Sequence, residues 1–345
     1  MKLKLPEGFP TEVLVAEAPE ESFFPEQRCR WVLLGDESVK EFWTFAELPE
    51  PAGSLWIKTS EATKQLDTLI PILEHWAAIP LHRDAVMVAV GGGVLTDMAG
   101  LAASLYLRGI KWHAWPTTLL AQVDAGLGGK TAVNLSAGKN LAGAFHAPSR
   151  LVACRSFLRT LPARQREAGR WEMVKTAVMI GDFAWAETIL GHDLPPTEFI
   201  QRTLAIKAEI VHRDPTEQGE RRLLNLGHTL GHALEAASHF QLLHGEAIGL
   251  GLLAACFLAE EKGLAPFPVP FLRRLAKALK PLAPLVAPWE ECRPWLLRDK
   301  KATHGSLSSP ELHCILPLPS QRARQMVLKS DDWITPHRRL LASLS

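Results

Sequence analysis

The sequence has no long hydrophobic run and few cysteines. No apolar run approaches the roughly 18 residues that a membrane-spanning helix needs, and the opening stretch MKLKLPEGFPTEV has no apolar signal-peptide region. We therefore expect a cytoplasmic protein that is neither exported nor embedded in a membrane. The cysteines are odd in number and show no C-x-x-C spacing, so we expect neither a disulfide framework nor a thiolate zinc site.

The sequence also has little net charge. Its 38 lysines and arginines nearly balance its 37 aspartates and glutamates, which leaves a formal net charge of +1. A nucleic-acid partner is not expected, because it would need a clustered basic surface. An acidic small ligand would have to be held by individual lysines and arginines. The length of 345 residues and the 47% hydrophobic content are typical of a soluble globular protein with room for two domains.

Short apolar runs alternate with amphipathic stretches in the first half of the chain. The expected strands are 13–16, 31–34, 55–57, 85–90 and 110–115. The expected helices between them are 38–46, 61–77 and 94–107. This alternation predicts an α/β domain over residues 1–160, with a parallel sheet whose ligands bind at the carboxyl ends of the strands.

Helical periodicity dominates after residue 160. The expected helices are 162–180, 182–191, 195–213, 225–238 and 244–262. The proline-rich stretch 265–288 predicts short helices joined by turns, and the apolar runs 312–316 and 326–328 predict a small hairpin. The second predicted domain, residues 161–345, is therefore mainly α-helical.

Residues 225–246 gather four histidines in a mostly apolar stretch. His228 and His232 are four apart, which places both rings on one face of a helix, where they can share a metal or divide metal binding and proton transfer. His244 follows after a break. Zinc hydrolases with a close histidine pair carry a glutamate between the two histidines, and none stands here, so peptide hydrolysis is not expected. Glu235 and Glu246 are both eligible as carboxylate ligands, and buried histidines bonded to the backbone are the alternative interpretation.

Three consecutive glycines, Gly91 to Gly93, end the buried stretch AVMVAV and precede a helix. Glycines let a ligand approach the backbone closely, and a helix N-terminus favours phosphate. The pattern is not G-x-G-x-x-G, and a plain tight turn is the alternative. We place Asp97 in the first turn of that helix. Asp36, at the end of WVLLGD, is a candidate for a ribose hydroxyl or for a helix N-cap.

A second glycine-rich stretch, residues 116–148, carries Asp124, Lys130, Asn134, Lys139 and Asn140. Lysines on glycine-rich loops suit phosphate or carboxylate binding, because small neighbours let the ligand contact backbone and ammonium together. A solvated surface loop is the alternative.

Glu172 and Lys175 are three apart in REAGRWEMVKTAV. On a helix they share one face, so a stabilising ion pair is the simplest interpretation. Farther along, residues 204–225 carry Lys207 and Arg221 towards the histidine stretch.

Three blocks together resemble the 3-dehydroquinate synthases, which are sugar-phosphate cyclases. The blocks are GGGVLTDMAG, then PTTLLAQVDAGLGGKTAVN with GKN, then NLGHTLGHALE with LHGEA. The resemblance covers roughly residues 30 to 330. It implies a Rossmann-like NAD domain followed by an α-helical domain, with the active site in the cleft between them.

The resemblance also implies a role for each matching position. The implied zinc ligands are Glu172, His228 and His244. The implied catalytic residues are His232, Lys130, Lys175, Asn225 and Asp124. The implied substrate-binding residues are Arg108, Lys139, Asn140, Lys207, Arg221 and one of Lys300 and Lys301. The implied NAD-binding residues are Asp36, Glu61, Lys64, Gly92, Gly93, Asp97, Thr117 and Thr118. Arg108 is expected to reach phosphate from the partner subunit of a homodimer.

The implied reaction converts 3-deoxy-D-arabino-heptulosonate 7-phosphate to 3-dehydroquinate and phosphate. It proceeds by transient oxidation with NAD, phosphate elimination, re-reduction and intramolecular aldol closure. The implied cofactors are NAD and Zn2+, for which Co2+ can substitute. This carbon–oxygen lyase belongs to the shikimate pathway, which leads to chorismate and the aromatic amino acids.

Some positions depart from the family pattern. Trp171 precedes Glu172 where alanine is usual, and Ala125-Gly126 replaces a serine pair. Ser136-Ala137 stands where Pro-Leu is common, and Phe145-His146-Ala147 replaces Phe-Tyr-x. These changes bear on substrate fit and rate, because none removes an implied ligand or phosphate-binding side chain.

Three other functions stay open. Another sugar-phosphate cyclase, of the aminodehydroquinate, 2-deoxy-scyllo-inosose or valiolone type, is the nearest alternative. A metal-dependent alcohol dehydrogenase shares the architecture but lacks the two lysine blocks. A non-catalytic member would bind without turnover.

Overall fold

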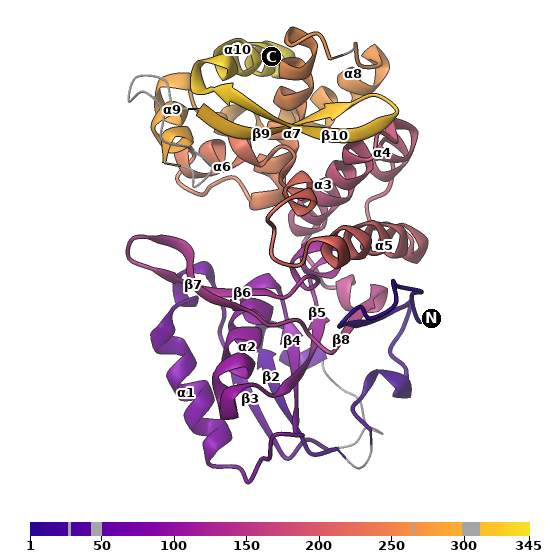
Figure 1. The fold of residues 1–345 in the computed structure, drawn as a ribbon, viewed down its shortest axis with the longest axis vertical. Coiled ribbons are helices and arrows are strands. Elements are labelled where there is room, and N and C mark those ends of the chain that lie inside the picture. Colours follow the sequence, from indigo (N-terminus) through magenta and orange to yellow (C-terminus); the bar gives the residue numbers. More distant parts are fainter. Residues whose placement is uncertain (27–28, 43–49, 265, 299–310) are drawn as a thin grey trace. The chain divides into compact units, whose positions relative to one another are not determined.

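The computed structural model describes residues 1–26, 29–42, 50–264, 266–298 and 311–345. The chain divides into two compact units, and Figure 1 labels α-helices and strands in both. The first unit comprises Met1–Pro162 and Pro196–Thr216, and the second comprises Ala163–Pro195 and Glu217–Ser345. Each unit is described by itself. The predicted domains, 1–160 for NAD and 161–345 for metal and substrate, and the cleft between them stay predictions.

A six-stranded parallel sheet forms the first unit, as predicted. Its strands are β1 (Glu12–Ala16), β2 (Trp31–Asp36), β3 (Gly53–Ile57), β4 (Val86–Gly91), β5 (Lys111–Pro116) and β8 (Arg150–Cys154). They lie in the order β1-β8-β5-β4-β2-β3, with every neighbouring pair parallel. All residues of β2 and β4 are buried, because such sheets are covered on both faces. The five expected strands are confirmed, and β8 was not expected.

Helices and short turns connect these strands. The α-helices of the first unit are α1 (Leu66–Ala77), α2 (Gly93–Leu105) and α5 (Thr197–Arg213). Its shorter helical turns are η1 (Glu21–Phe23), η2 (Glu37–Phe42), η3 (Glu61–Thr63), η4 (Tyr106–Arg108), η6 (Arg155–Leu158) and the π-helical η5 (Ala121–Ala125). Although α5 follows two helices of the second unit in the sequence, it packs against β1 and η5.

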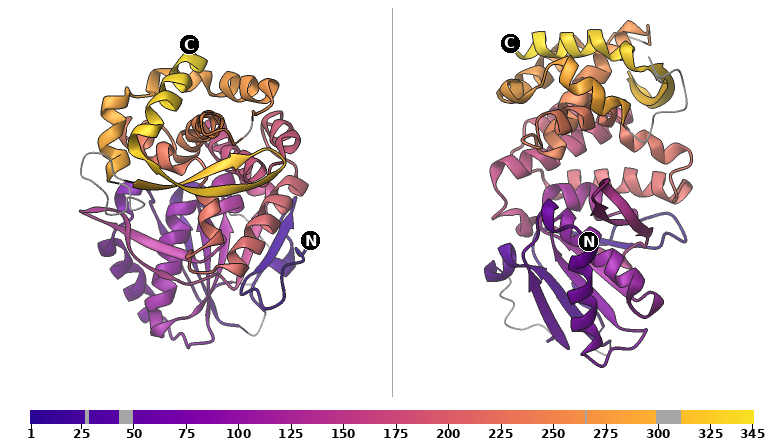
Figure 2. Two further views of the ribbon diagram at one scale, coloured as in Figure 1. Left: turned by 45° about the horizontal axis from the view of Figure 1, so that its top comes forward. Right: turned by 90° about the vertical axis from the view of Figure 1, so that its left-hand side faces the viewer.

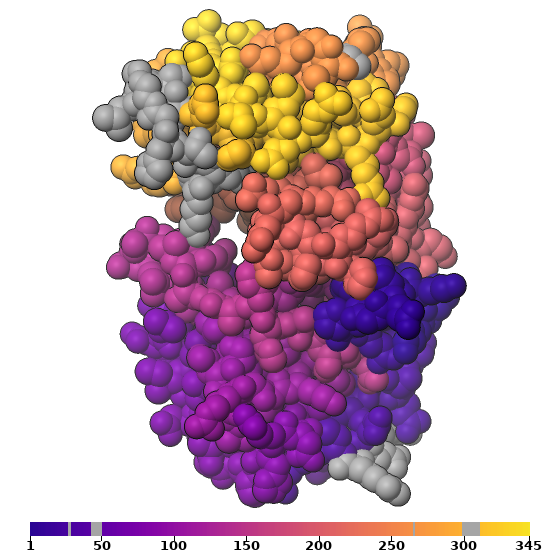
Figure 3. All heavy atoms as spheres, in the orientation of Figure 1, coloured from indigo at the N-terminus to yellow at the C-terminus, as the bar shows by residue number. Residues whose placement is uncertain are grey.

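A two-stranded hairpin follows η5. Its strands, β6 (Lys130–Leu135) and β7 (Gly138–Phe145), pair antiparallel with a register shift between Val133 and Leu135. The sequence interpretation had treated this stretch as loops. Leu135, Leu141 and Phe145 are exposed, and atoms of this part of the chain, coloured magenta, lie on the surface in Figure 3.

Helices dominate the second unit, also as predicted. They are α3 (Ala163–Met179), α4 (Phe183–Leu190), α6 (His228–Ala237), α7 (His244–Glu261), α8 (Val269–Leu279), α9 (Trp289–Leu297) and α10 (Ile334–Leu344). The shorter turns are η7 (Glu220–Asn225), η8 (Lys280–Leu285) and η9 (Ser330–Trp333), and the expected late hairpin is β9 (Glu311–Leu318) with β10 (Gln321–Lys329). Across the described residues, no helix is long and apolar enough to span a bilayer.

Helix α7 is the centre of the second unit. Every residue from Gly245 to Ala259 is buried, and the left view of Figure 2 shows other helices around it. Glycines let neighbouring helices approach it closely. A Cβ atom added to Gly245 would lie 1.9 Å from the carbonyl oxygen of Ala168 on α3. One added to Gly251 would lie 2.0 Å from the carbonyl oxygen of Gly227, which precedes α6. The backbones of α3, α6 and α7 therefore meet where a larger residue does not fit.

Candidate metal centre and cofactor-binding residues

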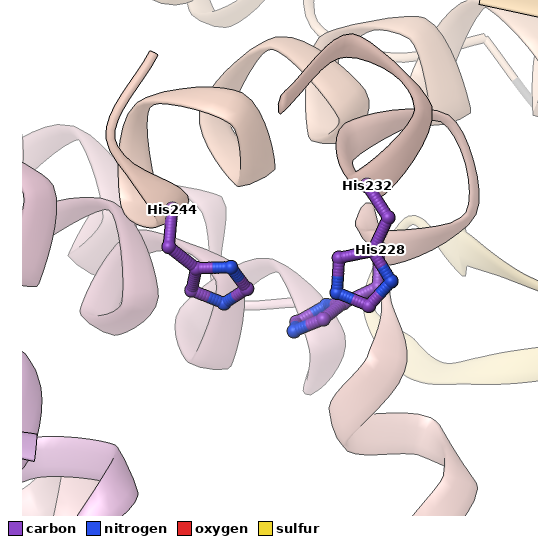
Figure 4. A group of neighbouring side chains, drawn as sticks. All are labelled: His228, His232 and His244. Carbon is purple, nitrogen blue, oxygen red and sulfur yellow. The ribbon is translucent and has the colours of Figure 1, made fainter. Parts of the chain in front are cut away.

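Three histidines converge at the start of two helices of the second unit. His228 is the first residue of α6, His232 lies one turn later, and His244 is the first residue of α7. One ring nitrogen of each lies within 4.8 Å of the others, and Figure 4 shows the three rings converging from the two helices. Helical spacing places the first pair together, and the contact between α6 and α7 adds the third.

A carboxylate from α3 lies beside this cluster. Glu172 is 1% exposed, and its Oε1 is 3.5 Å from Nε2 of His244. Its Oε2 forms an ion pair with Nζ of Lys175, so the expected i,i+3 pair is confirmed. The same carboxylate therefore contacts both a cation on its own helix and a histidine on α7.

Two other glutamates, both eligible from the sequence, have different partners. Oε2 of Glu235 lies 3.1 Å from Nδ1 of His244, on the opposite edge of the ring from Glu172. Glu246 accepts two hydrogen bonds from Arg164, at 2.6 and 2.7 Å, and one from the backbone N–H of Leu243 at 2.8 Å. Glu246 thus fixes the first turn of α7 to α3. Glu172 is the carboxylate on the Nε2 side of His244.

The donor set fits a borderline transition metal. Nδ1 of His228 lies 3.1 Å from the carbonyl oxygen of Leu226, and a carbonyl can only accept, so this nitrogen carries the hydrogen. The same argument applies to Nδ1 of His244 against the Glu235 carboxylate. In the neutral form of both rings Nε2 is then the nitrogen that can offer a lone pair to a metal. Imidazole nitrogens with one carboxylate oxygen are ligands typical of Zn2+ and also suit Co2+.

The electrostatic environment of His244 favours a cation. Burial alone lowers the pKa of this imidazole, but hydrogen bonds and charges from Glu172 and Glu235 outweigh it and raise the pKa to about 10 without a metal. A site that stabilises a proton this way also stabilises a metal ion, which competes for the same nitrogen.

Two more predicted site residues of the second unit lie just before α6, in η7. Arg221 is 2% exposed, and Nδ2 of Asn225 donates to Oε1 of Glu217 at 2.8 Å. Lys300 and Lys301 lie outside the described residues.

In the first unit, the predicted NAD-binding residues lie at one edge of the sheet. Asp36 ends β2, Gly92 caps α2 directly after β4, and Thr117 follows β5, where its N–H donates to the carbonyl of Gly91 at 2.9 Å. The chain runs from β2 outward to β3 and returns to β4 on the other side of β2, so the strand order reverses between β2 and β4. Such a reversal at the carboxyl edge is where open parallel sheets bind nucleotides. A Cβ on Gly92 would lie 3.1 Å from the Thr118 side chain, which brings these two positions together.

Asp97 is not in the first turn of α2, so that prediction was wrong. The helix begins at Gly93 and has no acidic residue in its first turn. Burial raises the pKa of Asp97 to about 6, although the charge of Lys64 opposes the shift. Nζ of Lys64 donates to Oδ2 of Asp97 at 2.6 Å, and the Asp97 side chain is 20% exposed.

Asp36 makes the contact expected of an N-cap. Its Oδ1 accepts from the backbone N–H of Ser38 at 2.8 Å at the start of η2, and its Oδ2 accepts from the Thr59 hydroxyl. A role in holding a ribose stays a prediction.

Polar contacts connect predicted NAD-binding and substrate-binding positions within the first unit. Lys64 also donates to Oδ1 of Asn140 at 2.6 Å. Oδ1 of Asn134 accepts from the backbone N–H of Asn140 at 2.9 Å, and its Nδ2 donates to Oε1 of Glu61 at 2.7 Å. Asn140 has φ of 53°, in the left-handed region. The sequence did not place Asn134 in the site, although it lies in the same motif.

Asp124 and Lys207 meet although they are distant in the sequence. Nζ of Lys207, on α5, donates to the carbonyl oxygen of Asp124 at 2.6 Å and pairs with its carboxylate. Lys130 and Lys139 lie exposed on the β6–β7 hairpin. Arg108 is exposed, and both it and Leu107 have positive φ, of 65° and 49°. Two left-handed residues in a row are unusual outside functional or strained turns.

Comparison with known proteins agrees with these arrangements. The family models for the N-terminal and C-terminal parts of 3-dehydroquinate synthase match residues 54–168 and 169–302. A 3-dehydroquinate synthase of Saccharophagus degradans is 36% identical over 334 residues, which cover 91% of this chain and 90% of the relative. The chain belongs to the 3-dehydroquinate synthase family. Its members are enzymes with cyclase and lyase activity in the shikimate pathway, which supplies the aromatic amino acids.

Solved structures of related cyclases are also similar to this member of the 3-dehydroquinate synthase family. A 2-deoxy-scyllo-inosose synthase complexed with carbaglucose-6-phosphate, NAD+ and Co2+ has a TM-score of 0.83 at 26% identity and covers 98% of this chain and 99% of that one. A 2-epi-5-epi-valiolone synthase from Streptomyces hygroscopicus subsp. jinggangensis 5008, with NAD+ and Zn2+ bound, has a TM-score of 0.79 at 25% identity and covers 99% of both chains.

Proposed function

We propose that this chain converts 3-deoxy-D-arabino-heptulosonate 7-phosphate to 3-dehydroquinate and phosphate with bound NAD and Zn2+. The observation that carries the proposal is the convergence of His228, His232 and His244 with the Glu172 carboxylate beside His244. NAD+ with Co2+ or Zn2+ in two structurally similar cyclases supports the cofactor pair.

In the proposed metal centre, Glu172, His228 and His244 hold the ion. When bound, the ion lowers the pKa of the C5 hydroxyl and polarises the ketone formed from it. Bound NAD would supply reversible hydride transfer at that carbon and so would be regenerated in each turnover. Lys175 beside Glu172 contributes positive charge where an oxyanion develops.

His232 is proposed to move a proton. It shares the cluster with His228 at a ring-centroid distance of 5.1 Å, and it lies one helical turn farther along α6 than the proposed ligand. With three ligands assigned elsewhere, its imidazole can accept the hydroxyl proton or orient the hydroxyl. Asn225 and Arg221, just before α6, are proposed to orient the substrate from the same unit.

The lysines are proposed to bind and position the phosphate. Elimination needs a proton removed from the carbon next to the ketone, and an oxygen of the departing phosphate can take it. The chain then has to hold the phosphate in line, for which Asn140 can donate a hydrogen bond. It also has to neutralise the phosphate charge, for which Lys130, Lys139 and Lys207 are suited. Asp124 orients Lys207 through the contact described above. After re-reduction the ring opens, and an intramolecular aldol addition closes the carbocycle.

Several finer assignments belong to the same proposal. NAD binds at Asp36, Glu61, Lys64, Gly92, Gly93, Asp97, Thr117 and Thr118. The enzyme is a cytoplasmic homodimer in which Arg108 of one subunit reaches phosphate in the other. One of Lys300 and Lys301 makes a further phosphate contact.

The deciding experiment supplies the heptulosonate phosphate with NAD+ and Zn2+ and follows inorganic phosphate together with the carbocyclic product. Equal amounts of phosphate and 3-dehydroquinate are expected. No phosphate release from metal-loaded protein would contradict the enzymatic function. Phosphate release from a hexose 6-phosphate instead would indicate a cyclase of the 2-deoxy-scyllo-inosose type. The TM-score of 0.83 to such an enzyme is the reason to test this alternative.

A further inference from the structure

The two proposed histidine ligands are held in different ways. Nδ1 of His228 donates to a backbone carbonyl, that of Leu226, at 3.1 Å. Nδ1 of His244 lies 3.1 Å from a side chain, Oε2 of Glu235, which is 14% exposed. A backbone carbonyl is present whatever the sequence, whereas the support of His244 depends on the identity of one residue.

We propose that Glu235 is a positioning residue for His244 and not itself a metal ligand. The inference rests on the metal centre proposed above. An ionised carboxylate can only accept, so it fixes a hydrogen on Nδ1 and leaves Nε2, which lies 3.5 Å from Oε1 of Glu172, as the nitrogen that can bind a metal. The negative charge of Glu235 also makes the ring a stronger donor to a cation.

The position of Glu235 on α6 explains how it reaches His244. It lies three residues after His232 and seven after His228, so all three side chains share one face of the helix. The chain then turns through Ser238 to Leu243. Oγ of Ser238 donates to the carbonyl of Glu235 at 2.8 Å and accepts from the N–H of Leu242 at 3.2 Å, which fixes the turn. Consequently the last turn of α6 and the first residue of α7 are held side by side.

The geometry separates this role from that of a ligand. The two nitrogens of an imidazole point to different edges of the ring, so a carboxylate bonded to Nδ1 does not face an ion bound at Nε2. Glu172 lies on the Nε2 edge and Glu235 on the Nδ1 edge. Glu246, the third carboxylate, is bound by Arg164 instead.

The test measures metal affinity of the metal-free protein, independently of turnover. Apo-protein is titrated with Co2+ and with Zn2+ against a competing chelator, and Co2+ binding is followed by visible absorption. Glu235→Ala is expected to weaken both affinities by about 10- to 100-fold, the usual effect of losing such a partner. Glu235→Gln retains a hydrogen-bond acceptor without the charge, so it is expected to recover part of the affinity and keep the Co2+ spectrum.

Two further variants make the outcomes distinguishable. Glu260→Ala removes a carboxylate from α7 that pairs with Arg339 at 2.7 Å, and it is expected to leave metal affinity unchanged. His244→Ala should abolish tight binding. If His244→Ala keeps the metal, the proposed centre itself is wrong.

The role of Glu235 is overturned separately. If His244→Ala loses the metal but Glu235→Ala binds it within threefold of the wild-type affinity, Glu235 does not position His244. If both Glu235 variants lose as much metal affinity as His244→Ala, and if their Co2+ spectra also change, Glu235 is a metal ligand and not a positioning residue. Circular dichroism checks that Glu235→Ala is folded, and if it is not, Glu235→Gln decides alone: affinity and spectrum equal to wild type would overturn the role.

Discussion

The two units hold their predicted site residues in contrasting ways. In the first unit these residues lie at strand ends, in turns and on a hairpin, and polar contacts such as Lys64 with Asp97 and Asn140 connect them. In the second unit Glu172, His228 and His244 lie on helices whose backbones touch at glycines. Positions in the first unit therefore depend on hydrogen bonds and charge. In the second unit the volume at the glycine contacts places the helices, and hydrogen bonds such as that of Glu235 orient the side chains they carry. The two kinds of site should fail under different substitutions.

The largest effect is expected where helix backbones touch. Gly245→Ala places a methyl group 1.9 Å from the Ala168 carbonyl oxygen, so α7 must move away from α3, and His244 with it. We expect the free energy of unfolding to fall by about 3 kcal/mol or more, because backbone cannot relax as a side chain does. Zn2+ affinity should fall in parallel, as measured by chelator competition.

Gly191→Ala is the matched control for this change. Gly191 is also in the second unit and has an ordinary φ of −76°, and its added Cβ would be 3.3 Å from the nearest atom, the Thr188 carbonyl oxygen. Urea unfolding should show a loss below about 1 kcal/mol. Equal losses in the two variants would contradict the volume argument.

In the first unit, the removal of one charge should matter more than volume. Lys64→Met keeps the length of a side chain that is 5% exposed but leaves Asp97 and Asn140 without its ammonium group. We expect a loss of about 2–3 kcal/mol in the free energy of unfolding and weaker NAD+ binding by calorimetry. The exposed Lys58, changed to methionine, provides the control. NAD+ affinity that is unchanged in Lys64→Met would remove Lys64 from the proposed cofactor site.

Acid should destabilise the first unit through His113. Burial, aided by the charge of Arg150, lowers the pKa of His113 to about 3 from an ordinary value of 6.5. Between those values the unfolded chain binds the additional proton, so the stability that His113 contributes is present above pH 6.5 and is lost as pH falls. At pH 5 the loss is about 2 kcal/mol.

His113→Gln should remove that pH dependence. Guanidinium unfolding at pH 7 and pH 5 should therefore show a smaller loss for the variant than for wild type. In the second unit the pKa of His337 is also lowered by burial, but its hydrogen bond to the Ala287 carbonyl opposes the shift. His337→Gln should therefore change the pH dependence of the free energy of unfolding less than His113→Gln does. A larger change for His337→Gln would contradict this comparison of the two units.

The smallest effect concerns a contact that involves a side chain. A Cβ on Gly249 would lie 2.6 Å from Cδ2 of the buried Trp171 ring. Gly249→Ala should lower the free energy of unfolding less in the Trp171→Ala background than in the wild-type background. A double-mutant cycle is expected to give a coupling of about 1 kcal/mol. Additive losses would show that Trp171 and Gly249 do not constrain one another.

Most elements were predictable because their signals are local. Apolar runs gave β1 to β5, and a 3.6-residue period gave α3 to α7 with ends within a few residues. The β6–β7 hairpin was missed because its glycines and lysines interrupt the alternation of a strand. The position of Asp97 was wrong because the three glycines do not reveal where α2 begins.

Contacts between residues that are far apart in the sequence were harder to predict. The spacing of His228 and His232 gave one face of the metal centre, but only the resemblance to a family supplied Glu172 as its carboxylate. Glu235 could have been found as the third member of an H-x3-H-x2-E stripe, although nothing local says that it meets His244 and not the metal. The attachment of α5 to the first unit depends on long-range packing that periodicity does not encode.

The placement of α5 has a consequence for synthesis on the ribosome. The chain enters the second unit at Ala163, returns to the first at Pro196 and leaves it again after Thr216. The first unit therefore cannot be completed when residue 162 emerges, because Lys207, the partner of Asp124, has yet to be translated. By the time it emerges, α3 and α4 have already been made without α7, whose Gly245 and Gly249 pack against α3. A nascent chain that has just exposed Lys207 therefore contains neither unit in complete form. A fragment that ends at Pro162 would lack α5, the helix that packs against β1 and η5.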